Sequence, residues 1–115
     1  MSEIKQLTAM ILKFRDERDW KQFHNPKDLA IGLALEAAEV LEHFHWKSKE
    51  EMEEYVKTHK EEIGEELSDV LYYVLNLSDD LGIDIVDAFK KKMVKNELKY
   101  PVAKAKGRHE KYDKL

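Results

Sequence analysis

One long segment of this chain places acidic residues beside the apolar side of a predicted helix. Between residues 61 and 78 the apolar residues recur at helical spacing, so one side of this segment must face a core. At about 100° per residue, Glu62, Glu66, Asp69 and Tyr73 form a continuous row that borders the apolar stripe. We therefore expect these acidic side chains to be partly buried. The segment has to pack against a partner that offsets their charge.

A second stretch, residues 33–41, repeats the arrangement. Glu36 and Glu39 lie three residues apart, with apolar residues at most neighbouring helical positions. Like charges about one turn apart repel, and partial burial makes each harder to ionise. If the two helices pack together, four carboxylates converge, and a hard divalent cation with oxygen ligands is the simplest compensation. In the alternative, each acid reaches solvent at the edge of its stripe or pairs with a lysine.

The remaining segments also carry helical signals. Asn25 followed by Pro26 is a good helix start, Gly82 is a natural helix stop, and Asp84 can cap a last helix. Two further helix starts have the form of a capping box, Ser48 with Glu51 and Thr58 with Glu61. No segment alternates with period two, and no Asn-Gly or Asp-Gly hairpin dipeptide occurs. The sequence therefore predicts an all-α fold, a bundle of four to five helices with the acidic pairs facing its interior. The expected helices are about 3–19, 26–46, 59–81 and 85–99, and residues 49–57 are expected to form a short, very polar helix or a helical loop.

Composition limits the classes of protein that the chain can belong to. Its 115 residues are enough for one domain, and the absence of cysteine excludes disulfides, thiolate nucleophiles and cysteine-based zinc sites. No apolar run is long enough to span a membrane, and the first residues lack the features of a signal peptide. We therefore expect a cytoplasmic protein with no membrane partner.

Charge is unevenly distributed along the chain. The net charge is −4, yet residues 89–115 hold ten of the twenty lysines and arginines. This distribution, with the basic residues concentrated near the C-terminus, is not typical of a nucleic-acid-binding protein, whose basic groups usually cover one face of the folded domain. We expect a domain over residues 1–101 and a basic, flexible tail over 102–115.

Phosphate binding, if it occurs, must depend on cations, because the chain has no P-loop and no glycine-rich phosphate cradle. Lys92 and Asn96 lie one turn apart on the last predicted helix, although composition alone favours a solvated lysine face over a phosphate site. Aromatic rings at helix ends or on the acidic row can stack on a nucleobase or fill the edge of a core. The candidates of this kind are Trp20, His24, Trp46 and Tyr73.

The acidic spacing resembles a known family motif. Glu36-x-x-Glu39 followed by Glu66-x-x-Asp69 is similar to the paired acidic motif of the MazG-like all-α nucleoside triphosphate pyrophosphohydrolases. Further stretches look like the dCTP pyrophosphatase branch of that family, and the likeness covers about residues 4–101. They are Glu17-Arg18-Asp19-Trp20-Lys21-Gln22-Phe23-His24, Phe44-His45-Trp46-Lys47, Glu65-Glu66-Leu67-Ser68-Asp69-Val70-Leu71-Tyr72-Tyr73, and Lys92-Met93 with Asn96 before Lys99-Tyr100-Pro101.

The resemblance implies an activity and a set of roles. It implies Mg²⁺-dependent hydrolysis of a (deoxy)nucleoside triphosphate, with dCTP or a modified cytosine nucleotide as candidates, to the monophosphate and pyrophosphate. Mn²⁺ is the expected substitute for Mg²⁺, and the expected assembly is a homodimer or homotetramer that completes the bundle. The implied metal-binding and catalytic residues are Glu36, Glu39, Glu66 and Asp69, with Lys92 and Asn96 on the phosphates and Trp20, His24, Trp46 and Tyr73 around the nucleoside.

The sequence is also compatible with two other functions. A di-iron carboxylate bundle needs two Glu-x-x-His steps, and only Glu42 with His45 supplies one, so His43 and His45 are interpreted as surface or helix-end histidines. A non-catalytic helical module would use the same acids to bind a basic partner. Such a module should release no pyrophosphate from any nucleotide in the presence of Mg²⁺.

Overall fold

The computed structural model describes residues 2–115, which form two compact units. The first unit ends at Gly82 and the second runs from Ile83 to Leu115. Gly82 adopts a positive φ of 67°, a conformation that favours glycine, at the point where one unit ends.

The first unit contains three long helices with well-formed N-terminal caps. The elements are α1 (Glu3–Glu17), a 3₁₀ turn η1 (Lys21–Phe23), α2 (Pro26–Glu42) and α3 (Lys49–Asp80). At the start of α2 the Asn25 side chain accepts a hydrogen bond from the Asp28 backbone N–H at 2.9 Å, and Pro26 follows in the first turn. At the start of α3, Ser48 and Glu51 form the predicted capping box.

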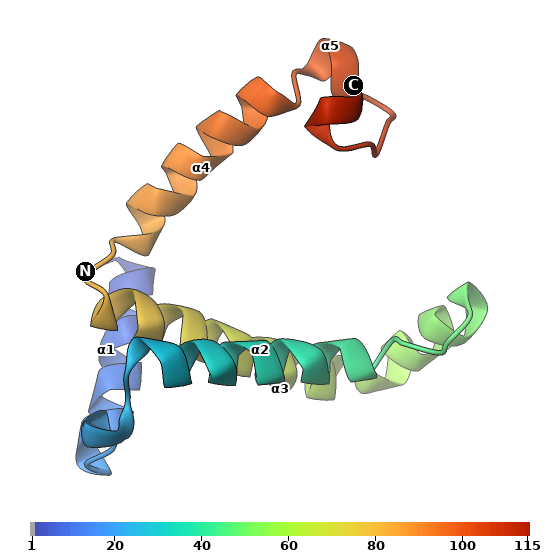
Figure 1. The fold of residues 1–115 in the computed structure, drawn as a ribbon. Helices are drawn as coiled ribbons and strands as arrows, with labels where there is room; N and C mark the ends of the chain where they lie inside the picture. Colours follow the sequence, from blue (N-terminus) through green and yellow to red (C-terminus); the bar gives the residue numbers. More distant parts are fainter. Residues whose placement is uncertain (1) are drawn as a thin grey trace. The chain divides into compact units, whose positions relative to one another are not determined.

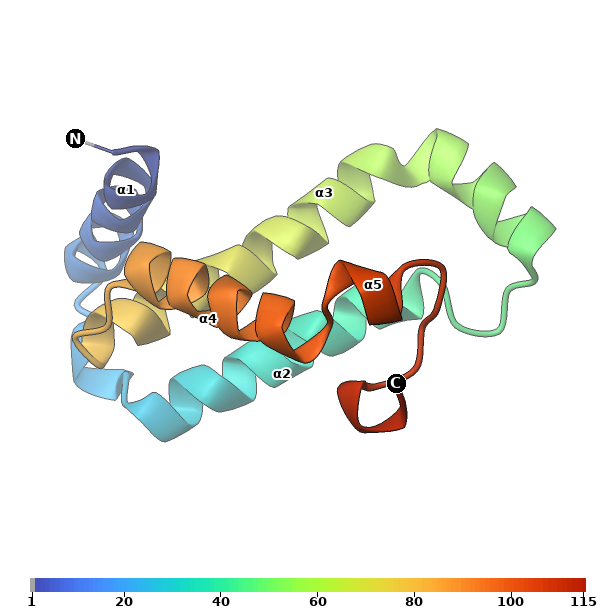
Figure 2. The ribbon, with the colours of Figure 1, turned by 90° about the horizontal axis from the view of Figure 1, so that it is seen from above.

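Helix α3 joins two helices that the sequence predicted to be separate. It spans 32 residues, but His59 within it has non-helical angles (φ −125°, ψ 18°). The predicted break between 57 and 59 is therefore a kink, visible as the bend in α3 in Figure 2. The second predicted helix is four residues too long, because α2 ends at Glu42 and residues 43–46 form turns.

Helices α2 and α3 pack side by side in opposite directions (Figures 1 and 2). Leu29 of α2 and Leu75 of α3 are the buried apolar residues of the described chain, with 1% and 2% of their surface exposed. Asn76 and Ser78 are buried beside Leu75 along α3. Helix α1 also packs on α3. The rings of Phe14 and Tyr72 meet edge-on there, with their centroids 6.3 Å apart. The helix pair α2–α3 is thus the frame that positions the acidic residues.

The second unit consists of one long helix, one short α-helix and one 3₁₀ turn. Helix α4 (Ile85–Lys99) is capped by Asp84, whose side chain accepts a hydrogen bond from the Asp87 N–H at 3.1 Å. Residues 102–115 contain α5 (Val102–Ala105) and the 3₁₀ turn η2 (Tyr112–Lys114). The ring of Tyr112 meets the Tyr100 ring edge-on at 6.2 Å. The flexibility of this segment and the predicted domain boundary at residue 101 stay predictions.

The predicted fold class is confirmed. Every regular element in residues 2–115 is helical, and no strand occurs among them. Within the described residues, no helix combines the length and the apolar character that crossing a membrane requires.

Candidate metal centre

Four carboxylates meet between α2 and α3. Glu36 and Glu39 lie about one turn apart on α2, and Glu66 and Asp69 have the same spacing on α3. One carboxylate oxygen from each residue can be chosen so that all four lie within 4.8 Å of one another. The predicted convergence of the two acidic pairs is therefore found in the structure.

Two of these acids have a raised pKa, because their surroundings disfavour the ionised form. Burial raises the pKa of Glu36, and hydrogen bonding to Glu39 and the negative charges of the other three acids raise it further. For Glu66, side-chain hydrogen bonding to Glu39 is the largest cause of a raised pKa, followed by burial. Nearby His43 acts in the opposite direction and favours the charged form of Glu66. The cluster thus holds excess negative charge that no lysine or arginine among its described ion pairs neutralises.

The oxygen atoms of the cluster fit a hard cation. Glu36 Oε2 and Glu66 Oε2 are buried and have no hydrogen-bond partner in the described part of the chain. Leaving a buried carboxylate oxygen unpaired is costly unless another group satisfies it. An all-oxygen donor set suits Mg²⁺, Mn²⁺ or Ca²⁺ better than softer metals. We conclude that these residues are suited to hold a divalent cation.

His43 is closer to the cluster than its sequence position predicted. It does lie at a helix end, as the C-terminal cap of α2, but only 12% of its side chain is exposed. Its Nε2 atom lies 3.7 Å from Glu66 Oε1, and its Nδ1 atom lies 2.6 Å from the Tyr55 hydroxyl. The helical spacing of residues 36, 39 and 43 was the available signal for His43. No local signal predicted the contact with Tyr55, which depends on how α3 bends.

Tyr73 lies against the backbone of α2. A Cβ atom added to Gly32 would come within 2.6 Å of Tyr73 Cζ, so the glycine is what allows the ring to sit there. Burial raises the pKa of Tyr73, and the charge of Glu36 adds to that effect. The predicted nucleoside contact Tyr73 is therefore placed next to the acidic cluster.

The other predicted aromatic residues lie at the ends of the helices. Trp20 follows α1 and packs edge-on against Phe14, with ring centroids 5.6 Å apart. His24 is half-buried, and its Nδ1 atom is buried without a hydrogen-bond partner in the described chain. Trp46 is 93% exposed and adopts a positive φ of 69° in the turn after α2.

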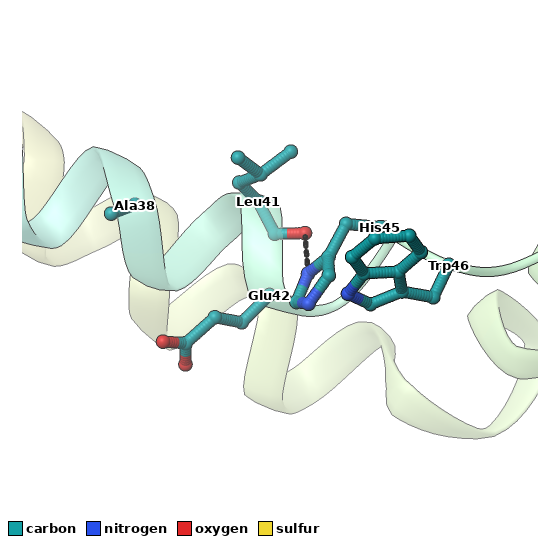
Figure 3. A pocket seen from close by; sticks show the side chains of 5 residues that line it. All are labelled: Ala38, Leu41, Glu42, His45 and Trp46. Atoms are coloured by element: carbon teal, nitrogen blue, oxygen red, sulfur yellow. Dashed lines mark hydrogen bonds between the residues drawn. The ribbon is translucent and has the colours of Figure 1, made fainter.

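Trp46 belongs to an open, mostly apolar pocket at the end of α2. Figure 3 shows its indole beside the His45 ring, whose Nδ1–H donates to the Leu41 carbonyl at 3.2 Å. Ala38 and Glu42 complete the lining. Glu42 and His45 thus face this pocket and are not members of the four-carboxylate cluster.

Lys92 and Asn96 lie on α4, in the second unit. They are one turn apart, as the sequence predicted, and the Asn96 amide contacts Met93 Sδ at 3.8 Å. Their roles remain predictions.

Known proteins resemble this chain along most of its length. The model of the MazG-like family matches residues 31–115. The dCTP pyrophosphatase 1 of Mus musculus is 38% identical over an alignment that covers 100% of this chain and 67% of the relative. The corresponding protein of Homo sapiens is 35% identical with the same coverage. This chain belongs to the MazG-like family.

A solved structure supports the MazG-like assignment at the level of the fold. The crystal structure of a pyrophosphatase from Archaeoglobus fulgidus DSM 4304 superposes with a TM-score of 0.82 at 42% identity. The match covers 88% of this chain and 94% of that protein. The predicted family, its dCTP pyrophosphatase-like branch and the enzyme class, a nucleotide pyrophosphatase, are therefore confirmed.

Proposed function

We propose that this MazG-like chain hydrolyses a (deoxy)nucleoside triphosphate to the monophosphate and pyrophosphate, with dCTP or a modified cytosine nucleotide as its preferred substrate. The proposal includes Mg²⁺, replaceable by Mn²⁺, held by Glu36, Glu39, Glu66 and Asp69. The observation that carries it is the meeting of four carboxylates within 4.8 Å, two of them with a buried, unpartnered oxygen. The cytosine preference rests on the relatives named dCTP pyrophosphatase 1.

The bound cation would neutralise phosphate charge and orient the triphosphate for in-line attack. The cluster has more carboxylates than one Mg²⁺ needs, because this ion usually binds through one or two carboxylates together with substrate phosphates. A remaining carboxylate can accept the proton of the water that attacks the α-phosphorus, as the bond from that phosphorus to the bridging oxygen breaks and pyrophosphate leaves. Glu36 suits this role where the other three acids hold the cation, because burial disfavours its charged form and raises its pKa.

The remaining predicted residues bind and orient the substrate in this proposal. Lys92 supplies a cation and Asn96 an amide donor for phosphate oxygens. Tyr73 lies next to the cluster and offers a ring that can contact the nucleoside. Trp20, His24 and Trp46 provide further stacking surfaces at helix ends.

The cluster favours this function over a di-iron oxidoreductase. A di-iron bundle uses histidine ligands in Glu-x-x-His steps, whereas the group found among the described residues contains carboxylates alone. Glu42 and His45, which supplied the single such step, face the pocket around Trp46. We therefore expect Mg²⁺ to support activity and iron to be dispensable.

A nucleotide panel tests the function directly. Purified protein is incubated with each of the four deoxynucleoside triphosphates, with 5-methyl-dCTP and with CTP, in Mg²⁺ or in EDTA, and pyrophosphate and monophosphate are measured. We expect equal amounts of both products, dependence on Mg²⁺ and the highest kcat/KM with a cytosine deoxynucleotide. Release of no pyrophosphate from any nucleotide would indicate a binding module instead.

A further inference from the structure

We propose that His43 and Tyr55 form a positioning pair that holds the Glu66 carboxylate in the acidic cluster and leaves one of its oxygens for the cation. This inference rests on the proposed function, because the orientation of Glu66 matters only if the cluster binds a metal ion. Neither residue belongs to the acidic motif from which the family resemblance was drawn.

The contacts form a chain from α3 through α2 and back to α3. The Tyr55 hydroxyl lies 2.6 Å from His43 Nδ1, within hydrogen-bond distance. On the other side of the same ring, His43 Nε2 lies 3.7 Å from Glu66 Oε1, an electrostatic contact rather than a hydrogen bond. One imidazole at the end of α2 therefore joins two points on α3.

The chemistry of the three groups selects one tautomer of His43. A carboxylate only accepts hydrogen bonds, so a nitrogen lone pair facing Glu66 would be repelled by it. A tyrosine hydroxyl can donate to Nδ1, which then places the ring proton on Nε2, towards Glu66. Removing the Tyr55 hydroxyl removes the group that selects this tautomer. Outer partners of this kind fix the orientation of metal-binding side chains.

Tyr55 is itself held in place. Its ring stacks on the His59 ring with centroids 3.8 Å apart and an angle of 5° between the planes. Lys47 Nζ lies 4.3 Å from the centre of the same ring. His59 is the residue at which α3 bends. The bend thus places the Tyr55 hydroxyl against His43 while the rest of α3 continues to Glu66.

The two oxygens of Glu66 are used differently. Oε1 faces His43, whereas Oε2 is buried and has no partner in the described chain. A histidine that attracts one oxygen leaves the other pointing into the cluster, where a cation would satisfy it. His43 therefore orients a ligand, and the expected consequence of losing it is weaker metal binding.

The test measures Mn²⁺ affinity without nucleotide, by the electron paramagnetic resonance signal of free Mn²⁺ in titrations of the full chain. The variants are Tyr55→Phe, which keeps the ring on His59, His43→Leu, and His43→Gln, whose amide N–H can replace the Nε2–H. Tyr112→Phe, in the second unit, is the matched control for loss of a hydroxyl. We expect His43→Leu to weaken binding about 10- to 100-fold. Tyr55→Phe should weaken it less, His43→Gln should recover part of the affinity, and Tyr112→Phe should match the wild type.

Melting temperatures in EDTA separate this role from a purely structural one. If Tyr55→Phe and His43→Leu melt earlier but bind Mn²⁺ like the wild type, the positioning role is overturned. If His43→Leu does not fold, Tyr55→Phe decides, with unchanged Mn²⁺ affinity overturning the proposal. If the wild type itself binds no Mn²⁺, the proposed metal site fails and this inference fails with it. Wild-type binding with unchanged variants refutes the positioning role alone.

Discussion

At the scale of single residues, the cluster brings together four carboxylates whose negative charges repel one another and that a bound cation would stabilise. Glu36 and Glu66 have raised pKa values because burial and the neighbouring carboxylates disfavour their charge. Such a site stores unfavourable electrostatic free energy in the metal-free fold, and cation binding releases it. Removing one acid should therefore have opposite effects on activity and on the stability of the metal-free protein.

Loss of activity is the first expected effect. Asp69→Ala and Glu66→Ala should each lower kcat/KM for pyrophosphate release by at least about 100-fold, because each removes a proposed metal ligand. Glu65→Gln is the matched control, since Glu65 is an exposed acid on the same helix outside the cluster. Circular dichroism should show that all three variants keep their helices. An active Asp69→Ala protein would refute the assignment of that residue.

Stability in EDTA should change in the other direction. The folded pKa of Glu66 lies above its ordinary value of 4.5, so the folded protein holds this proton more tightly than the unfolded chain does. Folding stability from this group is present below pH 4.5 and is lost as pH rises through the folded pKa. Glu66→Gln should therefore raise the melting temperature at pH 7.5, and the gain should shrink as the pH falls towards 4.5. A gain that is equal at both pH values, or absent at pH 7.5, would contradict this electrostatic account.

At the scale of elements, the close approach of α2 and α3 depends on Gly32. A side chain at this position would collide with the Tyr73 ring, whereas Gly64, on α3, has nothing within 4 Å of an added Cβ. These two helical glycines therefore allow a controlled comparison. They separate the effect of helix propensity from the effect of a crowded helix pair.

Opposite effects are expected for alanine at the two glycines. Gly32→Ala should lower the free energy of unfolding by about 1–3 kcal/mol, since the ring or the helix has to move. It should also raise KM, because Tyr73 is a proposed substrate contact. Gly64→Ala should raise stability by up to about 1 kcal/mol and leave KM unchanged. Urea denaturation and steady-state kinetics measure both, and a Gly32→Ala protein as stable as Gly64→Ala would contradict the predicted clash.

At the scale of the whole molecule, the helices leave much apolar surface uncovered. Large apolar side chains are exposed on both units, among them Met10, Leu35, Leu41, Phe89 and Leu98. Where such side chains gather into a large exposed surface, that surface usually marks an interaction site. A small domain with few buried apolar residues also gains stability from burial in an assembly.

We therefore predict self-association to a homodimer or homotetramer. Sedimentation or light scattering at micromolar concentration should give two or four times the 13.6 kDa chain mass. The melting temperature should rise with protein concentration, as expected when association stabilises the fold. Phe89→Lys should reduce the mass or its concentration dependence, whereas Lys90→Gln, at the next position, should not. A protein that stays monomeric at all concentrations would contradict the predicted self-association.

Much of this protein could be derived from local sequence patterns. The helical repeat of apolar residues is local, so it correctly predicted an all-α fold and the side of each helix on which Glu36, Glu39, Glu66 and Asp69 lie. Capping residues such as Asn25 and Ser48 likewise act within one turn, and their helices start where predicted. The spacing of the acids therefore predicted their convergence once the two helices were assumed to pack together.

Other features required the tertiary structure. The capping signal at Thr58 suggested a new helix, but the backbone continues through a kink at His59, where Tyr55 stacks on the His59 ring. Likewise, the environment of His43 is set by Tyr55 and Glu66, which lie 12 and 23 residues further along the chain. Such contacts depend on how two helices cross and where one of them bends. Helical periodicity specifies which face of a helix is apolar, but the partner of each side chain is decided only when the helices pack.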